Sequence, residues 1–207
     1  MRTRKADRMA GVSTLLALAQ TGAHHRHWYT NGVPVVHREA SRLGCTPREL
    51  AAVLALTSPR VQVRRNVQLT RLYMADRARL RTLSAPDLAS ELRLLSSTAA
   101  ALVHWEATGE IRGPKTRAFA AAVLGDPDAL VLDVWMARAL QVPQERVNLT
   151  ANYAKALKRV RAVARRLGWT VAEVQAAVWA GTIAGHRDAR GRRTYVDAPP
   201  LDRLLAA

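Results

Sequence analysis

The chain has 207 residues, 49% of them hydrophobic, so it is long and apolar enough for one sizeable core, and intrinsic disorder is excluded. Its 32 Lys and Arg against 16 Asp and Glu give a formal net charge of +16, which favours a polyanionic partner, most often nucleic acid, over a merely basic protein of an arginine-rich genome. The single cysteine, Cys45, rules out a disulfide within the chain and a four-cysteine iron–sulfur cluster, and no apolar run reaches membrane length. We therefore expect a monomeric, cytoplasmic and nucleoid-associated protein that binds DNA without a cofactor or a metal.

The N-terminal region begins with a basic arm over residues 1–10, which we expect to be loose. The basic residues ahead of the apolar run 12–19 imitate a secretory signal peptide. Ser13 is also typical of an N-cap residue, and the leucines after it have helical spacing. We therefore interpret residues 13–20 as an amphipathic helix and not as the leader of an exported protein.

The next stretch, His24–Tyr29, contains three histidines and invites a metal-site interpretation. Adjacent histidines do not share one helix face, and no carboxylate or cysteine lies near them in the sequence. The stretch therefore predicts a polar loop anchored by Trp28 and Tyr29, followed by a helix over 33–43 that ends at Gly44.

Two segments share one sequence pattern for the end of one helix and the start of the next. Such a junction is called a helix corner below. The segments LGCTPRELAAV at 43–53 and LGWTVAEVQAAV at 167–178 each contain a glycine stop, a threonine and a glutamate three residues later, followed by an apolar run. This order predicts a capping box at Thr46 and another at Thr170. Two copies indicate two similar corners and not a repeat array, which needs more copies.

An arginine-rich helix is predicted to begin at Ser58-Pro59 and to run toward Met74. Seven arginines and one acid lie between Arg60 and Arg81. They either form a solvated face or gather opposite the apolar side as a phosphate-binding stripe. Two further helices are expected over 84–110, separated near Ser96-Ser97.

The central stretch 111–138 combines a turn, a lysine and an aspartate. Gly113-Pro114 predicts a turn into a helix over 114–124, and Asp133 is expected to open the next helix after a buried return segment. Only four lysines occur, at 5, 115, 155 and 158, in a chain that otherwise uses arginine. Lys115 is thus either a phosphate contact or an amine nucleophile, a role that arginine cannot fill.

The C-terminal part contains a second basic helix, capped by Asn148 or Thr150 and reaching Leu167. Its polar face holds six basic residues and no acid: Lys155, Lys158, Arg159, Arg161, Arg165 and Arg166. In the helix that follows, Gln175 and Trp179 lie one turn apart, either as a hydrogen-bonded structural pair or as a pair that reads or stacks a base. Residues 185–193 predict a mobile basic loop, and 199–205 a last helical turn. Since every strong pattern has helical period, the predicted fold is all-α.

The central stretch resembles the helix-hairpin-helix DNA glycosylase superfamily of endonuclease III. The resemblance rests on Gly113-Pro114-Lys115-Thr116 and on Val131-Leu132-Asp133-Val134-Trp135 with Arg138, because Lys115 and Asp133 are 133 − 115 = 18 residues apart, as in that family. Ser58-Pro59…Asn66 and Gln175-Ala176…Trp179 are also similar to small actinobacterial and phage members. Ile111, Pro114 and Trp135 depart from the family pattern.

The resemblance, over roughly residues 45–180, implies roles for individual residues. Lys115 would be the nucleophile of lyase-type members, Asp133 the catalytic carboxylate and Ser58 the wedge at the early helix joint. Together with the basic stripes, it implies further DNA contacts at Arg112, Gly113, Thr116, Arg60, Arg64, Arg65, Lys158 and Arg161, and a base pocket at Trp135, Gln175 and Trp179.

The implied architecture is one two-lobed helical domain over 11–207. A barrel with the hairpin takes about 45–140, and the second lobe combines 11–44 with 141–207. The implied activity is that of a base-excision DNA glycosylase acting on the base–sugar bond of a flipped, damaged or modified base, with or without abasic-site lyase activity. The alternatives are a non-catalytic DNA-binding module and a phage or host enzyme that handles a hypermodified base.

Overall fold

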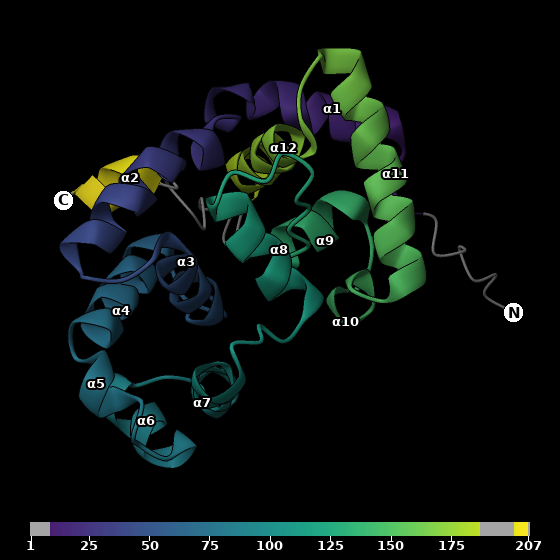
Figure 1. Cartoon of the computed structure of the whole chain (residues 1–207). Coiled ribbons are helices and arrows are strands. Elements are labelled where there is room, and N and C mark those ends of the chain that lie inside the picture. Colours follow the sequence, from purple (N-terminus) through teal and green to yellow (C-terminus); the bar gives the residue numbers. More distant parts are fainter. Residues whose placement is uncertain (1–8, 187–200, 207) are drawn as a thin grey trace, which may run out of the picture. The chain divides into compact units, whose positions relative to one another are not determined.

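The structure is a computed structural model that describes residues 9–186 and 201–206, and every element within these residues is a helix (Figure 1), so the all-α prediction is confirmed. No helix in the described ranges is long and apolar enough to cross a membrane. The helices in chain order are α1 (Val12–Thr21), the short 3₁₀ helix η1 (Ala23–His25), α2 (Trp28–Arg42), α3 (Pro47–Leu56), α4 (Val63–Ala75), α5 (Arg77–Leu80), α6 (Ala85–Leu92), α7 (Ser96–Thr108), α8 (Pro114–Val123), α9 (Val134–Leu140), α10 (Gln144–Val147), α11 (Thr150–Leu167), α12 (Val171–Gly185) and α13 (Leu201–Ala206).

The chain forms two compact units. Unit 1 takes the described residues of 1–29 and 126–198, and unit 2 those of 30–125 and 199–207. These bounds differ from the expected lobes, because 126–140 belongs to unit 1, while 30–44 and the C-terminal helix belong to unit 2. The physical reason is burial: Leu130, Leu132 and Met136 are fully enclosed in the core of unit 1. In unit 2, α13 packs against α4, and Arg71 donates to the carbonyl of Leu205 at 2.8 Å.

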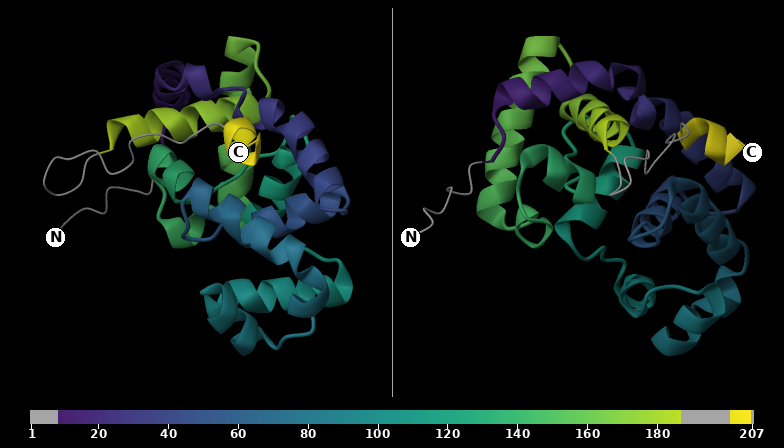
Figure 2. Two further views of the ribbon diagram at one scale, coloured as in Figure 1. Left: turned by 90° about the vertical axis from the view of Figure 1, so that its left-hand side faces the viewer. Right: turned by 180° about the vertical axis from the view of Figure 1, so that it is seen from behind.

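Unit 1 is built around α12. This helix is apolar on almost every side, with Val174, Ala177 and Val178 fully buried, as expected of a helix inside a core. Helices α1, α9 and α11 all pack against it. In both views of Figure 2, the purple α1 runs beside the yellow-green α12.

Unit 2 is built around α3, which is buried at every position from Leu50 to Leu56. Helices α4, α7 and α8 each pack against α3. The predicted capping box at its start is present: Glu49 N donates to Thr46 Oγ1, and the Glu49 carboxylate accepts from Thr46 N at 2.8 Å. The matching box at Thr170 and Glu173 begins α12 in unit 1. Both corners were therefore predicted correctly.

The prediction that Ser58-Pro59 opens a helix is wrong. Helix α4 begins only at Val63, and Arg60 has a left-handed backbone with φ of 59°. The reason is a buried polar contact: the Asn66 side chain accepts from Thr57 Oγ1 at 2.7 Å and donates to Leu54 O at 3.0 Å. These bonds join the end of α3 to the first turns of α4, so the segment between them must turn.

Three other helix starts differ from the prediction. Ser13 lies inside α1, whose N-cap is Gly11. Helix α2 begins at Trp28, earlier than the predicted 33, although Trp28 and Tyr29 are buried as the anchoring prediction requires. At α11 the N-cap is Leu149, because the Asn148 amide instead donates to Leu132 O at 3.3 Å. The predicted loose arm and the predicted loop at 185–193 lie largely outside the described residues.

Candidate active site around Asp133

Asp133 is held by the two segments that meet at it. The preceding residues 129–132 are buried, and Asp133 is the N-cap of α9, as the sequence predicts. Its Oδ1 accepts from Trp135 N at 3.0 Å and from Met136 N at 2.9 Å. An N-cap carboxylate satisfies N–H groups that the helix cannot, and it lies at the positive end of the helix dipole. One oxygen of Asp133 is therefore fixed by its own helix.

The second oxygen of Asp133 contacts α12. Trp179 Nε1 donates to Asp133 Oδ2 at 3.0 Å. The ring of Trp179 lies 6.3 Å from that of Trp28, and Trp28 meets Tyr29 edge-to-face at 4.9 Å. The half-buried Asp133 carboxylate is thus oriented by three N–H donors and has aromatic rings beside it.

Tyr29 and Gln175 complete this group of side chains. Burial, with a smaller contribution from the negative charge of Asp133, raises the pKa of the Tyr29 phenol, while a hydrogen bond from Gln175 acts in the opposite direction. Gln175 is 2% exposed, and its Oε1 has no hydrogen-bond donor within the described part of the chain. Buried amide oxygens normally have a donor, so this buried oxygen is an exception. Trp28, Tyr29, Asp133, Gln175 and Trp179 are called the Asp133 cluster below.

Trp135, which departs from the family pattern, lies in the first turn of α9. Its ring carries the Arg138 guanidinium at 4.4 Å and meets the His186 ring edge-to-face at 5.1 Å. Such stacking fixes the indole in place. The structure therefore brings Asp133, Gln175 and Trp179 together, with Trp135 on the adjoining turn of α9.

Lys115 belongs to unit 2, whereas Asp133 belongs to unit 1. Gly113 has φ of 88°, which is the left-handed backbone that the Gly-Pro turn predicts, and α8 begins at Pro114 as expected. Lys115 and Thr116 are half-buried in its first turn, while Arg112 is exposed. The turn is formed, and its lysine lies in the first turn of α8.

The arginine stripe of unit 2 is smaller than predicted. Arg71 pairs with the buried Glu39 at 2.6 Å, and Arg77 pairs with Glu49 and Glu106 at 2.6 and 2.7 Å. Arg79 pairs with Asp76 and Glu91. These arginines form ion pairs within unit 2, because acidic side chains from other helices lie close to them. Arg60, Arg64 and Arg65 are exposed, and Ser58 is half-buried with its hydroxyl donating to Ala55 O at 2.8 Å.

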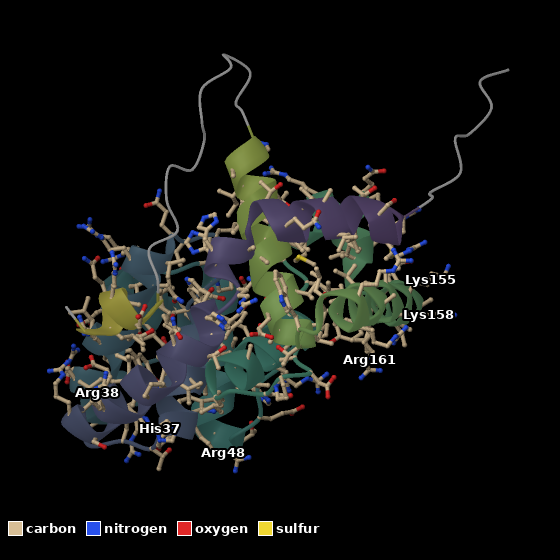
Figure 3. All side chains as sticks on the ribbon, turned by 90° about the horizontal axis from the view of Figure 1, so that it is seen from above. His37, Arg38, Arg48, Lys155, Lys158 and Arg161 are labelled. Carbon is tan, nitrogen blue, oxygen red and sulfur yellow. The ribbon has the colours of Figure 1, made fainter. Side chains whose placement is uncertain are left out.

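The basic face of α11 agrees better with the prediction. Lys155, Lys158, Arg161, Arg165 and Arg166 are all exposed. Figure 3 shows Lys155, Lys158 and Arg161 on the outer side of this helix. Arg161 lies 3.5 Å from Asp128, and both side chains are at least half exposed. An exposed pair of this kind is weak, so the face stays available to phosphates.

Metal ligands do not gather in the described residues, where no group of three or more His, Cys, Asp and Glu side chains could hold an ion. His27 instead lies 3.1 Å from Glu173.

The single cysteine is not activated. Burial raises the pKa of the Cys45 thiol, which disfavours the reactive thiolate.

Comparison with known proteins gives a family but no activity. The model of the family of unknown function DUF7178 matches residues 12–187, which is more than half of the chain. The chain belongs to the DUF7178 family. No curated protein and no solved structure matches it. All residues of the Asp133 cluster, and Lys115, lie inside the segment that the DUF7178 model covers.

Two members of the Asp133 cluster were missed by sequence reasoning. Trp28 and Tyr29 were interpreted only as anchors of a polar loop. Their sequence distance from Asp133 exceeds a hundred residues, so no local pattern joins them to it. The signal in the sequence is the adjacent aromatic pair itself, which lies in the first turn of α2.

Proposed function

We propose that this protein is a DNA glycosylase-like enzyme that acts on the base–sugar bond of a flipped, damaged or modified base. The observation that supports this best is the Asp133 cluster, in which a carboxylate fixed by three N–H donors lies beside aromatic rings. An enzyme of this kind extrudes its target base and stacks it on aromatic side chains. The fixed carboxylate then stabilises the cationic sugar that develops as the base leaves.

DNA is the proposed partner because of charge. The net charge of +16 and the exposed basic face of α11 both favour a polyanion. The exposed Arg60, Arg64 and Arg65 beside the turn that holds Ser58 provide further phosphate contacts, and the turn at Gly113 offers N–H groups at the start of α8.

Lys115 is the proposed nucleophile if the enzyme also cleaves abasic sites. An amine can attack the sugar carbon and form a Schiff base, which a guanidinium cannot do. Borohydride is expected to trap a covalent adduct between wild-type protein and DNA with an abasic site. Both Lys115→Gln and Lys115→Arg are expected to abolish the adduct, and an adduct with Lys115→Arg would assign the nucleophile to another amine.

The test of the main proposal is release of a free base. Purified protein is incubated with duplex and single-stranded DNA that carries alkylated, oxidised, deaminated or hypermodified bases, and released bases are identified by mass spectrometry. We expect one class of base to be released by wild-type protein. Absence of release from every substrate, with DNA binding intact, would favour the second candidate.

That second candidate is a non-catalytic DNA-binding module on the same scaffold. The specific observation in its favour is that both oxygens of Asp133 already accept N–H groups. In this case Asp133 is only a helix cap, and Asp133→Asn would alter stability without altering any chemistry.

A further inference from the structure

A cavity of about 530 Å³ lies in unit 1 between the loop after α9 and the first half of α11. One part of its wall is cationic and consists of Arg146, Lys155 and Arg159. None of the described residues that line it is acidic. The cavity shares no lining residue with the Asp133 cluster, so it is a separate feature of the unit.

Arg159 has an unmet hydrogen-bonding requirement. Its Nη1 is buried and has no acceptor within the described part of the chain. A guanidinium presents five N–H donors and matches the oxygens of a phosphate, and a buried donor without an acceptor is costly. An anionic oxygen in the cavity would remove that cost.

The N-terminal end of α11 adds a second preference for anions. The helix begins at Thr150, and its N-cap residue, Leu149, makes no side-chain hydrogen bond to the first turn. Its first N–H groups therefore contribute positive potential beside the cavity. The Asn152 amide donates to Arg146 O at 2.9 Å, which connects α10 to this turn.

The remaining lining residues are mostly apolar. Met9, Val142, Pro143 and Leu149 are called the apolar wall here, and the polar side chains of Gln141 and Asn152 also line the cavity. Leu149 is 55% exposed. The volume lies within the range of about 300–1,000 Å³ that small-ligand sites occupy. A ligand that fits these residues has phosphate groups for the cations and a less polar group for Val142, Pro143 and Leu149.

We propose that this cavity binds a nucleoside phosphate, with its phosphates on Arg146, Lys155 and Arg159 and its base or sugar on the apolar wall. The nucleoside phosphate is either a free nucleotide or the terminal nucleotide of a DNA strand. The exposed Lys158 and Arg161 continue along α11 from the cavity, so a strand has basic side chains to follow. The proposal does not depend on the activity proposed for Asp133.

The experiment measures binding by titration calorimetry with the four deoxynucleoside triphosphates, tripolyphosphate, uncharged nucleosides, and oligothymidylate with and without a 5′ phosphate. Lys155→Gln and Arg159→Gln are compared with Arg165→Gln, an exposed arginine of the same helix that does not line the cavity. Thermal unfolding of each variant checks the fold, and the exposed Lys155 gives a test that leaves the core intact.

A nucleotide that binds wild-type protein and loses at least about tenfold in affinity in both cavity variants, but not in Arg165→Gln, supports the site. The same pattern only with 5′-phosphorylated oligothymidylate supports it with a strand end as the source. Tripolyphosphate binding as tight as nucleotide binding, equal losses in Arg165→Gln, or no binding of either ligand overturns it. Base release is measured separately. Failure of the cavity proposal therefore does not overturn the activity proposed for Asp133, and failure of that activity does not overturn the cavity proposal.

Discussion

Gly22 and Gly181 bring the backbones of α1 and α12 into direct contact. A Cβ at Gly181 would lie 2.1 Å from Leu18 O, and a Cβ at Gly22 would lie 2.0 Å from Ala177 O and 2.5 Å from Gly181 N. Neither neighbour is a flexible side chain, so the helices would have to separate. Gly22 lies directly before η1, which leads to the start of α2. The contact therefore fixes the chain just ahead of Trp28 and Tyr29, which belong to the Asp133 cluster.

The first prediction is that Gly22→Ala and Gly181→Ala each destabilise the protein by about 1–3 kcal/mol or more, because overpacking against backbone cannot be relieved by a rotamer change. Urea unfolding followed by circular dichroism measures the loss. Gly185→Ala is the matched control, since nothing lies near a Cβ at that exposed position of α12. The control is expected to be neutral or stabilising by up to about 1 kcal/mol. Equal behaviour of the three variants would contradict the contact.

The second prediction concerns pH and unit 2. The hydrogen bond from Arg77, followed by those from Thr46, lowers the pKa of Glu49 to about 2. A lowered folded-state pKa stabilises the protein above the ordinary value of 4.5, and this stabilisation is lost as the pH falls toward 2. Glu49→Gln keeps a capping box but removes the charge. The variant is expected to be less stable than wild type at pH 7, with the difference shrinking between pH 4.5 and 2.

The control for this series is Glu145→Gln, at an exposed acid outside unit 2. It is expected to change the free energy of unfolding little at any pH. A difference between Glu49→Gln and wild type that is constant with pH would show that the Arg77 pair contributes nothing through ionisation.

The third prediction is that DNA binding depends on the face of α11. Lys158→Gln combined with Arg161→Gln is expected to reduce the slope of log K against log salt by about 2, since each lost phosphate contact removes about 1. Arg71→Gln is the contrasting variant, because Arg71 pairs with the buried Glu39. It is expected to lower thermal stability while leaving the salt slope unchanged. An unchanged slope in the double variant would remove α11 from the DNA-binding surface.

The parts of the fold that could be predicted are those set by neighbours in sequence. The caps at Thr46, Asp133 and Thr170 each depend on a few consecutive residues, and all three are present. The turn at Ser58-Pro59 was misjudged because the amide of Asn66, eight residues later, determines it.

The candidate site was predictable only in part, for the same reason. Asp133 and Trp179 could each be selected from local patterns, but the 3.0 Å bond between them links residues 46 apart. Tyr29 joins them from the other end of the chain. Likewise, Arg71 and Arg77 could not be removed from the predicted stripe, because Glu39, Glu49 and Glu106 reach them only in the folded chain.

The fourth prediction separates packing from chemistry in the Asp133 cluster. Trp179→Phe keeps an aromatic ring but removes the donor to Asp133 Oδ2. Loss of a hydrogen bond to a charged group is expected to cost about 1.5–3 kcal/mol of stability, and base release is expected to fall as the carboxylate loses one constraint. Trp169→Phe is the control, since Trp169 contacts Arg26 through its ring. Unaltered stability and unaltered base release in Trp179→Phe would show that the hydrogen bond from Trp179 to Asp133 contributes to neither.

The most direct test of the central claim is base release by Asp133→Asn. Asparagine is as good an N-cap as aspartate, so its Oδ1 can still accept from Trp135 N and Met136 N, while the negative charge and the acceptor for Trp179 Nε1 are lost. Asp126→Asn is the matched control, because the exposed Asp126 also accepts a backbone N–H, from Asp128 at 2.9 Å. On the base identified by mass spectrometry, we expect Asp133→Asn to lower the single-turnover rate of release by about 100-fold or more, with DNA affinity retained and the control unaffected. Release at the wild-type rate by folded Asp133→Asn would contradict the assignment of Asp133 as the catalytic carboxylate.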